Sequence, residues 1–168
     1  MRATRSVRPT GTIDPGLRIR VLPARHYSGR FLDHNQSLWA SFALESDRRR
    51  LYFSGDTGFG PHFADIARQF RDFDLVALDA GQYNERWANI HMNPEEASQA
   101  TQILRARTLM MAHAGRLTLA RRPWDEPFHR AVAASQGKPY RLLTPRIGEP
   151  VLLSEREQRF GHRWVGID

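Results

Sequence analysis

The feature that most constrains the fold is an alternation of strand-like and helix-like segments. Residues 73–80 ("FDLVALDA") form a continuous apolar run, which is typical of a strand that is buried on both faces. Residues 94–105 have the pattern of a helix, in which Asn93 can cap the first turn and Pro94 suits the first helical position. Residues 108–113 ("TLMMAH") then have the pattern of another strand. Strands that alternate with helices predict an α/β fold.

The rest of the chain extends this pattern into one domain. We expect further strands at 17–23, 37–46, 51–53 and 149–154, and further helices at 61–70 and 126–137. Residues 1–16 are rich in Arg, Thr, Pro and Gly and show no periodicity, so we expect a loose N-terminal tail. The predicted domain therefore spans 17–155, and 156–168 is expected to form a C-terminal tail.

The composition limits the chemistry that the chain can use. With 168 residues the chain is long enough for a hydrophobic core, and without cysteine it has neither disulfides nor thiolate metal ligands. Any bound metal must therefore be held by histidine and carboxylate side chains. No apolar run approaches the length that crosses a bilayer, and the Arg-rich start lacks the apolar region of a signal peptide. We expect a cytoplasmic protein that contacts a membrane, if at all, only peripherally.

The net charge of +7 invites an interpretation as a nucleic-acid-binding protein. The basic residues are almost all arginines, and they are scattered along the chain rather than grouped in a stripe with aromatic residues between them. A solvated surface is the commoner explanation of such a pattern, so nucleic acid is not the expected partner. A non-catalytic basic fragment that binds nucleic acid or another chain is the alternative from a different class of function.

The segment "YFSGDTGFG" at residues 52–60 places Asp56 directly after a short strand-like run. Its glycines predict a tight turn that needs a positive φ or a close backbone approach. An aspartate in this position reaches the rim of a sheet, where open α/β folds bind their ligands. An ordinary turn at the end of a strand has the same appearance, and the segment alone does not distinguish the two.

Histidines also follow strand-like segments, namely His26, His91 and His113. Because strand ends gather along one edge in a layered α/β fold, these side chains and Asp56 can converge although they are far apart in the sequence. Imidazoles with a carboxylate are the ligands of a catalytic zinc site or of related first-row metals. A single histidine is more often a surface or core residue than a ligand, so the two interpretations are evenly balanced at this point.

A series of motifs then resembles one family. The segments "LPARHYSGR", "SLW", "YFSGDTGFGPHF", "HMNPEEA" and "MAHAGRLTLA…WDEP" occur in the order found in one branch of the metallo-β-lactamase-fold hydrolases. This branch contains N-acyl phosphatidylethanolamine phospholipase D and its bacterial relatives. The resemblance covers about residues 17–153 and is to the C-terminal half of a pseudo-symmetric αββα sandwich. The implied fold is α/β, half of such a sandwich, with a mixed sheet and helices packed on one face.

The resemblance also implies roles for individual residues. His26 matches a ligand of one zinc ion, His113 matches a ligand of the second, and Asp56 matches the aspartate that bridges both. His91 matches a histidine that lines the active site, so Asp56 and His91 are the implied catalytic residues. The implied cofactor is zinc, with two ions in the complete family site.

Departures from the family pattern limit what the resemblance implies. Tyr83 and Arg86 match positions of the lipid-cleaving members and would contact the substrate together with His91, but the surrounding "LDAGQYNERW" differs from their pocket wall. The family signature His-x-His-x-Asp-His, which supplies the remaining ligands of both zinc ions, does not precede His26 here. Each zinc ion would then have one histidine and the shared Asp56 as protein ligands, fewer than a stable site uses.

The implied function is hydrolysis by a hydroxide that is held between the metals. A small-molecule or lipid phosphodiester is the first expected substrate class, and a lactone is the alternative. By itself the chain is expected to bind zinc weakly and to hydrolyse near background. The expected partner is a second copy or another chain that supplies the missing half, because the inner face of the sheet would otherwise be exposed.

Overall fold

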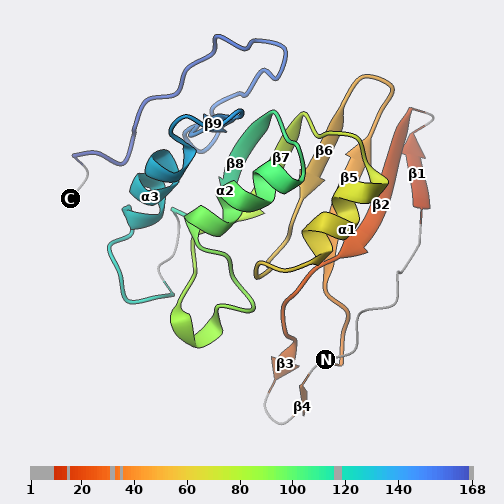
Figure 1. Cartoon of the computed structure of the whole chain (residues 1–168), viewed down its shortest axis with the longest axis horizontal. Helices are drawn as coiled ribbons and strands as arrows, with labels where there is room; N and C mark the ends of the chain where they lie inside the picture. Colours follow the sequence, from red (N-terminus) through yellow and green to blue (C-terminus); the bar gives the residue numbers. More distant parts are fainter. Residues whose placement is uncertain (1–9, 15, 31–32, 35, 116–118, 167–168) are drawn as a thin grey trace.

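A seven-stranded sheet organises the molecule (Figure 1). The structure is a computed structural model that describes residues 10–14, 16–30, 33–34, 36–115 and 119–166. The strands lie in the order β1-β2-β5-β6-β7-β8-β9. Their bounds are Thr10–Asp14 (β1), Leu17–Pro23 (β2), Ala40–Glu45 (β5), Arg50–Phe53 (β6), Leu75–Asp79 (β7), Thr108–Ala112 (β8) and Arg141–Leu143 (β9). A separate short pair is formed by Gly29–Arg30 (β3) and Asp33–His34 (β4).

The helices cover one face of this sheet. Strands β1, β2, β5 and β6 are antiparallel neighbours, whereas β6, β7, β8 and β9 are parallel. Because the parallel strands follow one another in a single direction, right-handed crossovers place their connecting helices on the same side, as Figure 1 shows. The predicted α/β fold, a mixed sheet with helices on one face, is confirmed. The connections contain His62–Gln69 (α1), the 3₁₀ helix Glu85–Trp87 (η1), Pro94–Ile103 (α2) and Glu126–Ser135 (α3).

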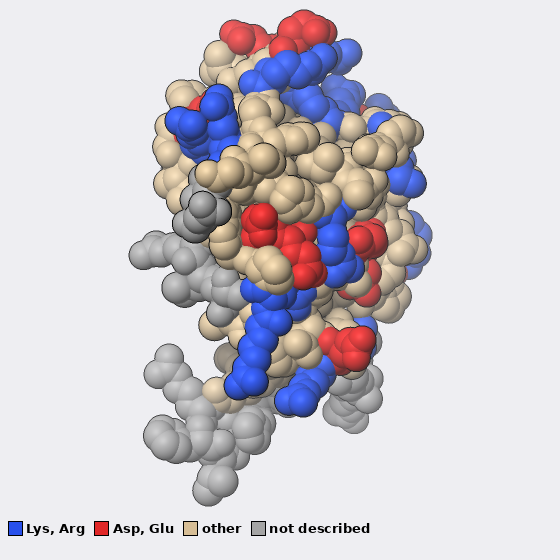
Figure 2. All heavy atoms as spheres, turned by 90° about the vertical axis from the view of Figure 1, so that its left-hand side faces the viewer, with Lys and Arg blue, Asp and Glu red and all other residues tan. Residues whose placement is uncertain are grey.

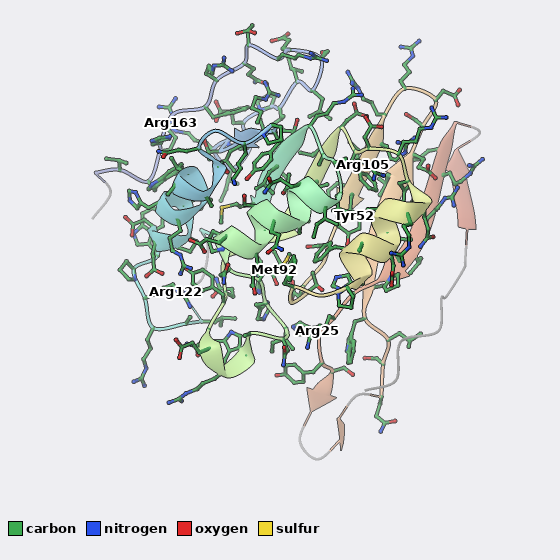
Figure 3. All side chains as sticks on the ribbon, in the orientation of Figure 1. Arg25, Tyr52, Met92, Arg105, Arg122 and Arg163 are labelled. Atoms are coloured by element: carbon green, nitrogen blue, oxygen red, sulfur yellow. The ribbon has the colours of Figure 1, made fainter. Side chains whose placement is uncertain are left out.

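The main hydrophobic core lies between the sheet and the helices. Strand β7 is buried at every position, as its continuous apolar run predicts. The ring of Tyr52 on β6 is fully buried and packs against Phe63 of α1 and against Phe73, with ring centroids 6.4 Å and 5.6 Å apart. Figure 3 shows Tyr52 beside α1 in this layer. The aromatic rings therefore fix α1 on the antiparallel half of the sheet.

Arg105, which is also labelled in Figure 3, closes the end of α1. Its guanidinium donates hydrogen bonds to the carbonyl oxygens of Ala67, Phe70 and Arg71 at 2.6, 2.6 and 2.5 Å. The last carbonyls of a helix have no partner within the helix, and a cation is favourable there because it meets the negative end of the helix dipole. Arg105 thus ties the segment after α2 to the end of α1.

Helix α2 begins as the sequence predicts. The Asn93 side chain accepts a hydrogen bond from the Glu96 N–H at 2.8 Å, and the Glu96 carboxylate accepts one from the Asn93 N–H at 2.9 Å. This reciprocal pair is a capping box, and Pro94 occupies the first turn. The helix ends at Ile103, slightly before the predicted end at residue 105.

The strands at the two edges of the sheet differ from the prediction, and the short pair β3–β4 was not predicted. Residues 10–14, where the sequence predicts a loose tail, form β1 and pair with β2, because an edge strand is held by backbone hydrogen bonds and leaves no hydrophobic periodicity. The predicted strand at 149–154 is irregular instead, since Gln158 donates to the Pro150 carbonyl and accepts from the Leu152 N–H at 2.8 and 2.9 Å. The last strand is β9, which follows β8 in the parallel part of the sheet.

The sheet face opposite the helices carries an apolar strip. Register places six side chains on this face of β2, β5 and β6, because paired residues share a face and alternate with the core positions. They are Ile19, Val21, Phe42, Leu44, Leu51 and Phe53. All are partly or largely exposed, and Phe42 is 40% exposed. We call these residues the open-face strip.

Surface charge of both signs is mixed on the side of the molecule that carries α3, as Figure 2 shows. Arginines there lie next to carboxylates, and Arg130 binds Glu95 at 2.6 Å. On this face the described residues form no continuous basic stripe. Within the described part of the chain, none of the helices combines the length and apolarity required to span a membrane.

Candidate active site

Strand direction brings the predicted site residues to one edge of the sheet. Strands β7 and β8 run parallel to β6, and β2 does so too, because β5 lies between β2 and β6 and is antiparallel to both. His26 follows β2, Asp56 follows β6, and His113 follows β8. The carboxyl ends of these strands therefore share one edge, as we expect from the sequence.

His91 lies in the middle of a cluster at this edge. Its ring centroid is 5.1 Å from that of His26 and 5.2 Å from that of His113. The Nε2 atom of His113 lies 3.9 Å from Asp56 Oδ2. The structure thus brings together His26, His91, His113 and Asp56, which we call the histidine cluster.

Residues 86–90 ("RWANI"), which precede His91, do not form the strand that we expect before this histidine. The segment is instead η1 followed by a turn, in which the Asn84 side chain accepts a hydrogen bond from the Arg86 N–H at 3.0 Å. The N–H groups of Ile90 and His91 then donate to the Trp87 carbonyl at 2.9 and 3.4 Å. An asparagine that caps a turn competes with strand pairing, which explains the difference.

Glycines allow three loops to meet under the cluster. Gly55 has a φ of +60°, the left-handed conformation that the sequence predicts for this turn. A Cβ atom on Gly58 would lie 2.3 Å from the backbone of Asn89, and one on Gly81 would lie 2.1 Å from the His113 carbonyl oxygen. The loops that carry Asp56, His91 and His113 therefore touch through positions where a side chain would not fit.

Hydrogen bonds join the His26 segment to the loop that carries Asp56. The Arg25 N–H donates to Thr57 Oγ1, and the Gly58 N–H donates to the Arg25 carbonyl, both at 2.8 Å. The Arg25 guanidinium also donates to the Phe59 carbonyl at 2.8 Å. The chain on either side of His26 and Asp56 is thus held in a fixed relation.

Asp79 is a site residue that the sequence reasoning did not identify. It ends β7, is fully buried, and its Oδ2 atom accepts hydrogen bonds from His91 Nδ1 at 2.6 Å and from the Thr57 N–H at 3.1 Å. Burial raises the pKa of Asp79, while the hydrogen bond from His91 acts in the opposite direction. The signal was present, because Asp79 ends a buried strand just as Asp56 follows one. Its role is to orient His91.

The donor chemistry of His26 fits a metal ligand. Its Nδ1 atom lies 2.6 Å from the Tyr27 carbonyl oxygen, and since a carbonyl only accepts, Nδ1 carries the proton. The Nε2 atom therefore holds a lone pair, and it is buried without a hydrogen-bond partner among the described residues. However, no three histidine or carboxylate groups of the described residues lie close enough together to hold a metal ion. The described residues by themselves thus do not form a complete metal site.

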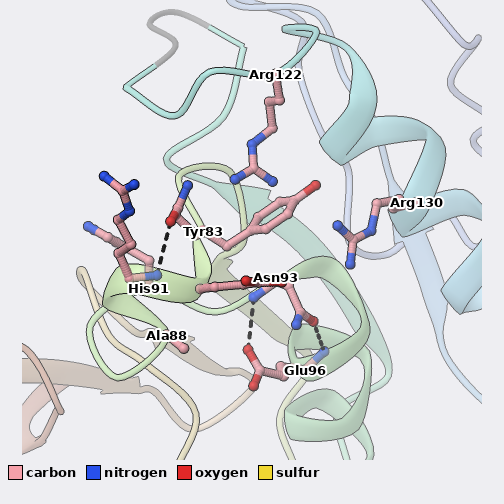
Figure 4. A pocket seen from close by; sticks show the side chains of 10 residues that line it. Tyr83, Ala88, His91, Asn93, Glu96, Arg122 and Arg130 are labelled. Atoms are coloured by element: carbon pink, nitrogen blue, oxygen red, sulfur yellow. Dashed lines mark hydrogen bonds between the residues drawn. The ribbon is translucent and has the colours of Figure 1, made fainter.

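A pocket adjoins the cluster through His91 (Figure 4). Its volume is about 480 Å³, and Tyr83 and Arg86 line it together with His91, Arg122 and Arg130. The Tyr83 ring lies between the two latter guanidinium groups, whose central carbons are 3.4 Å and 4.6 Å from its centroid. Burial raises the pKa of the Tyr83 hydroxyl to about 12, so this group stays protonated. The residues that the resemblance assigns to the substrate thus share one pocket with His91.

A mixed sheet with helices on one face, with histidines and aspartates gathered at its strand ends, defines an α/β domain of the metallo-β-lactamase type. Residues 2–114 match the family described as "Beta-lactamase superfamily domain". The chain belongs to this family, whose fold is that of the metallo-β-lactamases.

Relatives and a solved structure agree with this assignment. Over 100 residues the chain is 50% identical to the outer membrane protein RomA of Klebsiella pneumoniae, covering 60% of this chain and 76% of RomA. It is 42% identical over 101 residues to N-acyl-phosphatidylethanolamine-hydrolyzing phospholipase D 1 of Caenorhabditis elegans, covering 58% of this chain and 28% of the relative. Igni18, a metallo hydrolase from the archaeon Ignicoccus hospitalis, superposes with a TM-score of 0.59 at 20% identity, covering 84% of this chain and 56% of Igni18.

Proposed function

We propose that this chain carries part of a metal-dependent hydrolytic site for phosphodiesters. The histidine cluster is the observation that supports it, above all the buried lone pair of His26 Nε2 beside His91. The similarity to a phospholipase D over 101 residues favours a phosphodiester over the lactone alternative. Zinc is the proposed metal because imidazole and carboxylate groups without thiolates suit a catalytic zinc site.

Each residue has a role in this proposal. His26, Asp56 and His113 serve as ligands, and the chemistry supplied by bound zinc ions is a hydroxide at neutral pH and stabilisation of the developing negative charge. Asp79 Oδ2 accepts a hydrogen bond from His91 Nδ1–H at 2.6 Å, which leaves the Nε2 lone pair of His91 as a proton acceptor beside the pocket. Tyr83 and Arg86 contact the substrate from the pocket that His91 lines.

We further propose that donors beyond the described residues complete the site. Two ligands for each metal ion are fewer than the three or four of stable sites, and no group of three donors exists in the described part of the chain. A second copy of this chain or another chain would supply the missing donors. The chain alone should therefore bind zinc weakly and hydrolyse phosphodiesters slowly, close to background.

Zinc titration by calorimetry tests the ligands. His113→Ala and Asp56→Ala should lose the weak zinc binding, whereas His129→Ala should retain it, because His129 lies on the exposed side of α3 beside Asp125. Equal zinc binding by His113→Ala and the unaltered chain would refute the ligand assignment. Tight binding of two zinc ions, with turnover that Asp56→Ala abolishes, would show instead that the chain's own residues complete the site.

Hydrolysis at saturating zinc tests the substrate class. We expect slow turnover of bis-nitrophenyl phosphate above the level of Asp56→Ala. Turnover of simple lactones without turnover of bis-nitrophenyl phosphate would favour a lactone as the substrate class. If a longer version of the chain that supplies the missing donors is active on neither compound, both substrate classes are ruled out.

A further inference from the structure

The pocket beside His91 contains an arginine with an unused hydrogen-bond donor among the described residues. The Arg122 side chain is only 11% exposed, and its guanidinium stacks on the Tyr83 ring with its central carbon 3.4 Å from the ring centroid. The nearest carboxylate oxygen that pairs with it belongs to Glu126, 3.5 Å from a terminal nitrogen. Its Nε atom is buried and has no hydrogen-bond partner among the described residues.

Arg130, on the other side of the same ring, is fully engaged and provides the contrast. Its guanidinium donates to both carboxylate oxygens of Glu95 at 3.0 and 2.6 Å and to Glu126 at 3.3 Å. Glu126 also accepts a hydrogen bond from the Tyr83 hydroxyl at 2.6 Å. Glu126 contacts both arginines and offsets the charge of Arg122, but at 3.5 Å it leaves the N–H donors of Arg122 without a close acceptor among the described residues.

A largely buried cation without close hydrogen-bonded partners is costly, and stacking on an aromatic ring offsets only part of that cost. Such a group is ready to bind an anion that brings the missing acceptors. Figure 4 shows Arg122 directed toward Tyr83, and His91 lines the same pocket. Arg86 also lines the pocket, as do the carboxylates of Glu85 and Glu96. The pocket volume of about 480 Å³ is in the range of small-molecule sites.

We infer that Arg122, supported by the Tyr83 ring, binds a negatively charged oxygen group that the substrate carries in addition to its reacting bond. A planar guanidinium offers parallel N–H donors that match a phosphate or a carboxylate, and Tyr83 and Glu126 hold its plane in place. The inference rests on the proposed function, because the pocket adjoins the histidine cluster through His91. It narrows the substrate class to phosphodiesters that carry a further phosphate or carboxylate group.

Binding of inorganic phosphate to the chelator-treated protein tests the inference without any metal. Calorimetric titration should show phosphate binding to the unaltered chain, and Arg122→Gln should weaken it about tenfold or more, since a charge-assisted bidentate contact is lost. Arg121→Gln is the matched control, because Arg121 is the adjacent, exposed arginine. Arg122→Lys keeps the charge without the planar fork and should fall between the two. A parallel titration with acetate shows whether a carboxylate is accepted as well as a phosphate.

The melting temperature of each variant shows whether it folds. If Arg122→Gln does not fold, Arg122→Lys carries the test, with weaker phosphate binding than Arg121→Gln as the supporting result. Phosphate binding that is the same in the unaltered chain and in the folded Arg122 variant, or no phosphate binding at all, would overturn the inference. These results are independent of the zinc titration: loss of zinc binding bears on the proposed function alone, and loss of phosphate binding bears on Arg122 alone.

Discussion

Folding disfavours the protonated form of His62. This histidine is buried at the start of α1, its ring centroid lies 4.2 Å from that of Phe63, and burial together with the nearby charge of Arg25 lowers its pKa from 6.5 to about 4. The unfolded chain therefore binds more protons than the folded chain between these pH values. The stability that His62 contributes is complete above pH 6.5 and is lost as the pH falls toward 4.

We predict that the contribution of His62 lowers the free energy of unfolding by about 2 kcal/mol when the pH falls from 7 to 5. Urea unfolding at both pH values measures the decrease, and His62→Gln should remove that part of it. His129→Gln, at an exposed histidine of α3, should leave it in place. The same pH dependence in His62→Gln as in the unaltered chain would contradict the assigned pKa.

The sequence predicts the positions of side chains that directly follow strands. It does not predict positions that depend on packing between distant segments. Asp56, His26 and His113 follow strands, so their meeting at one edge is predictable once strand directions are assumed. Arg122 comes from an irregular segment, and its position over Tyr83 depends on contacts between distant parts of the chain. Local sequence patterns carry no information about such a contact.

The cap of α2 involves only residues at the start of this helix, so a single substitution can measure its contribution to stability. Asn93→Ala removes the acceptor of the Glu96 N–H, which should lower the free energy of unfolding by about 1 kcal/mol. Thermal or urea unfolding measures the change. Gln99→Ala, at an exposed position of the same helix, should change stability little. An unaltered melting curve for Asn93→Ala would mean that the cap does not form in solution.

Elements with strong local signals were predictable, and those that depend on neighbours were not. Helix α2 has an asparagine cap, a proline in its first turn and a capping glutamate, so its start follows from the sequence. Strands β1 and β9 have no such signals. Each lies at an edge of the sheet and exists because a neighbouring strand offers its backbone groups. The predicted strand at 149–154 shows the converse, since its apolar residues find no neighbouring strand.

For the whole molecule, we expect the open-face strip to govern association in solution. It places apolar side chains of β2, β5 and β6 side by side on the face without helices. Such a contiguous apolar surface on a soluble domain favours association. The solved structure of Igni18 is longer, and this chain covers 56% of it. In the isolated chain, we expect a second copy to cover the strip.

We predict concentration-dependent self-association that Phe42→Thr weakens. Phe42 is 40% exposed at the middle of the strip, and threonine keeps a strand-forming residue there while it removes most of the apolar surface. Light scattering across a range of protein concentrations measures the association. Leu152→Thr is the matched control, because Leu152 is an exposed apolar residue (46%) outside the strip, in the irregular C-terminal segment. A chain that stays monomeric at all concentrations, or a Phe42→Thr variant that associates as strongly as Leu152→Thr, would show that the strip is not the contact surface.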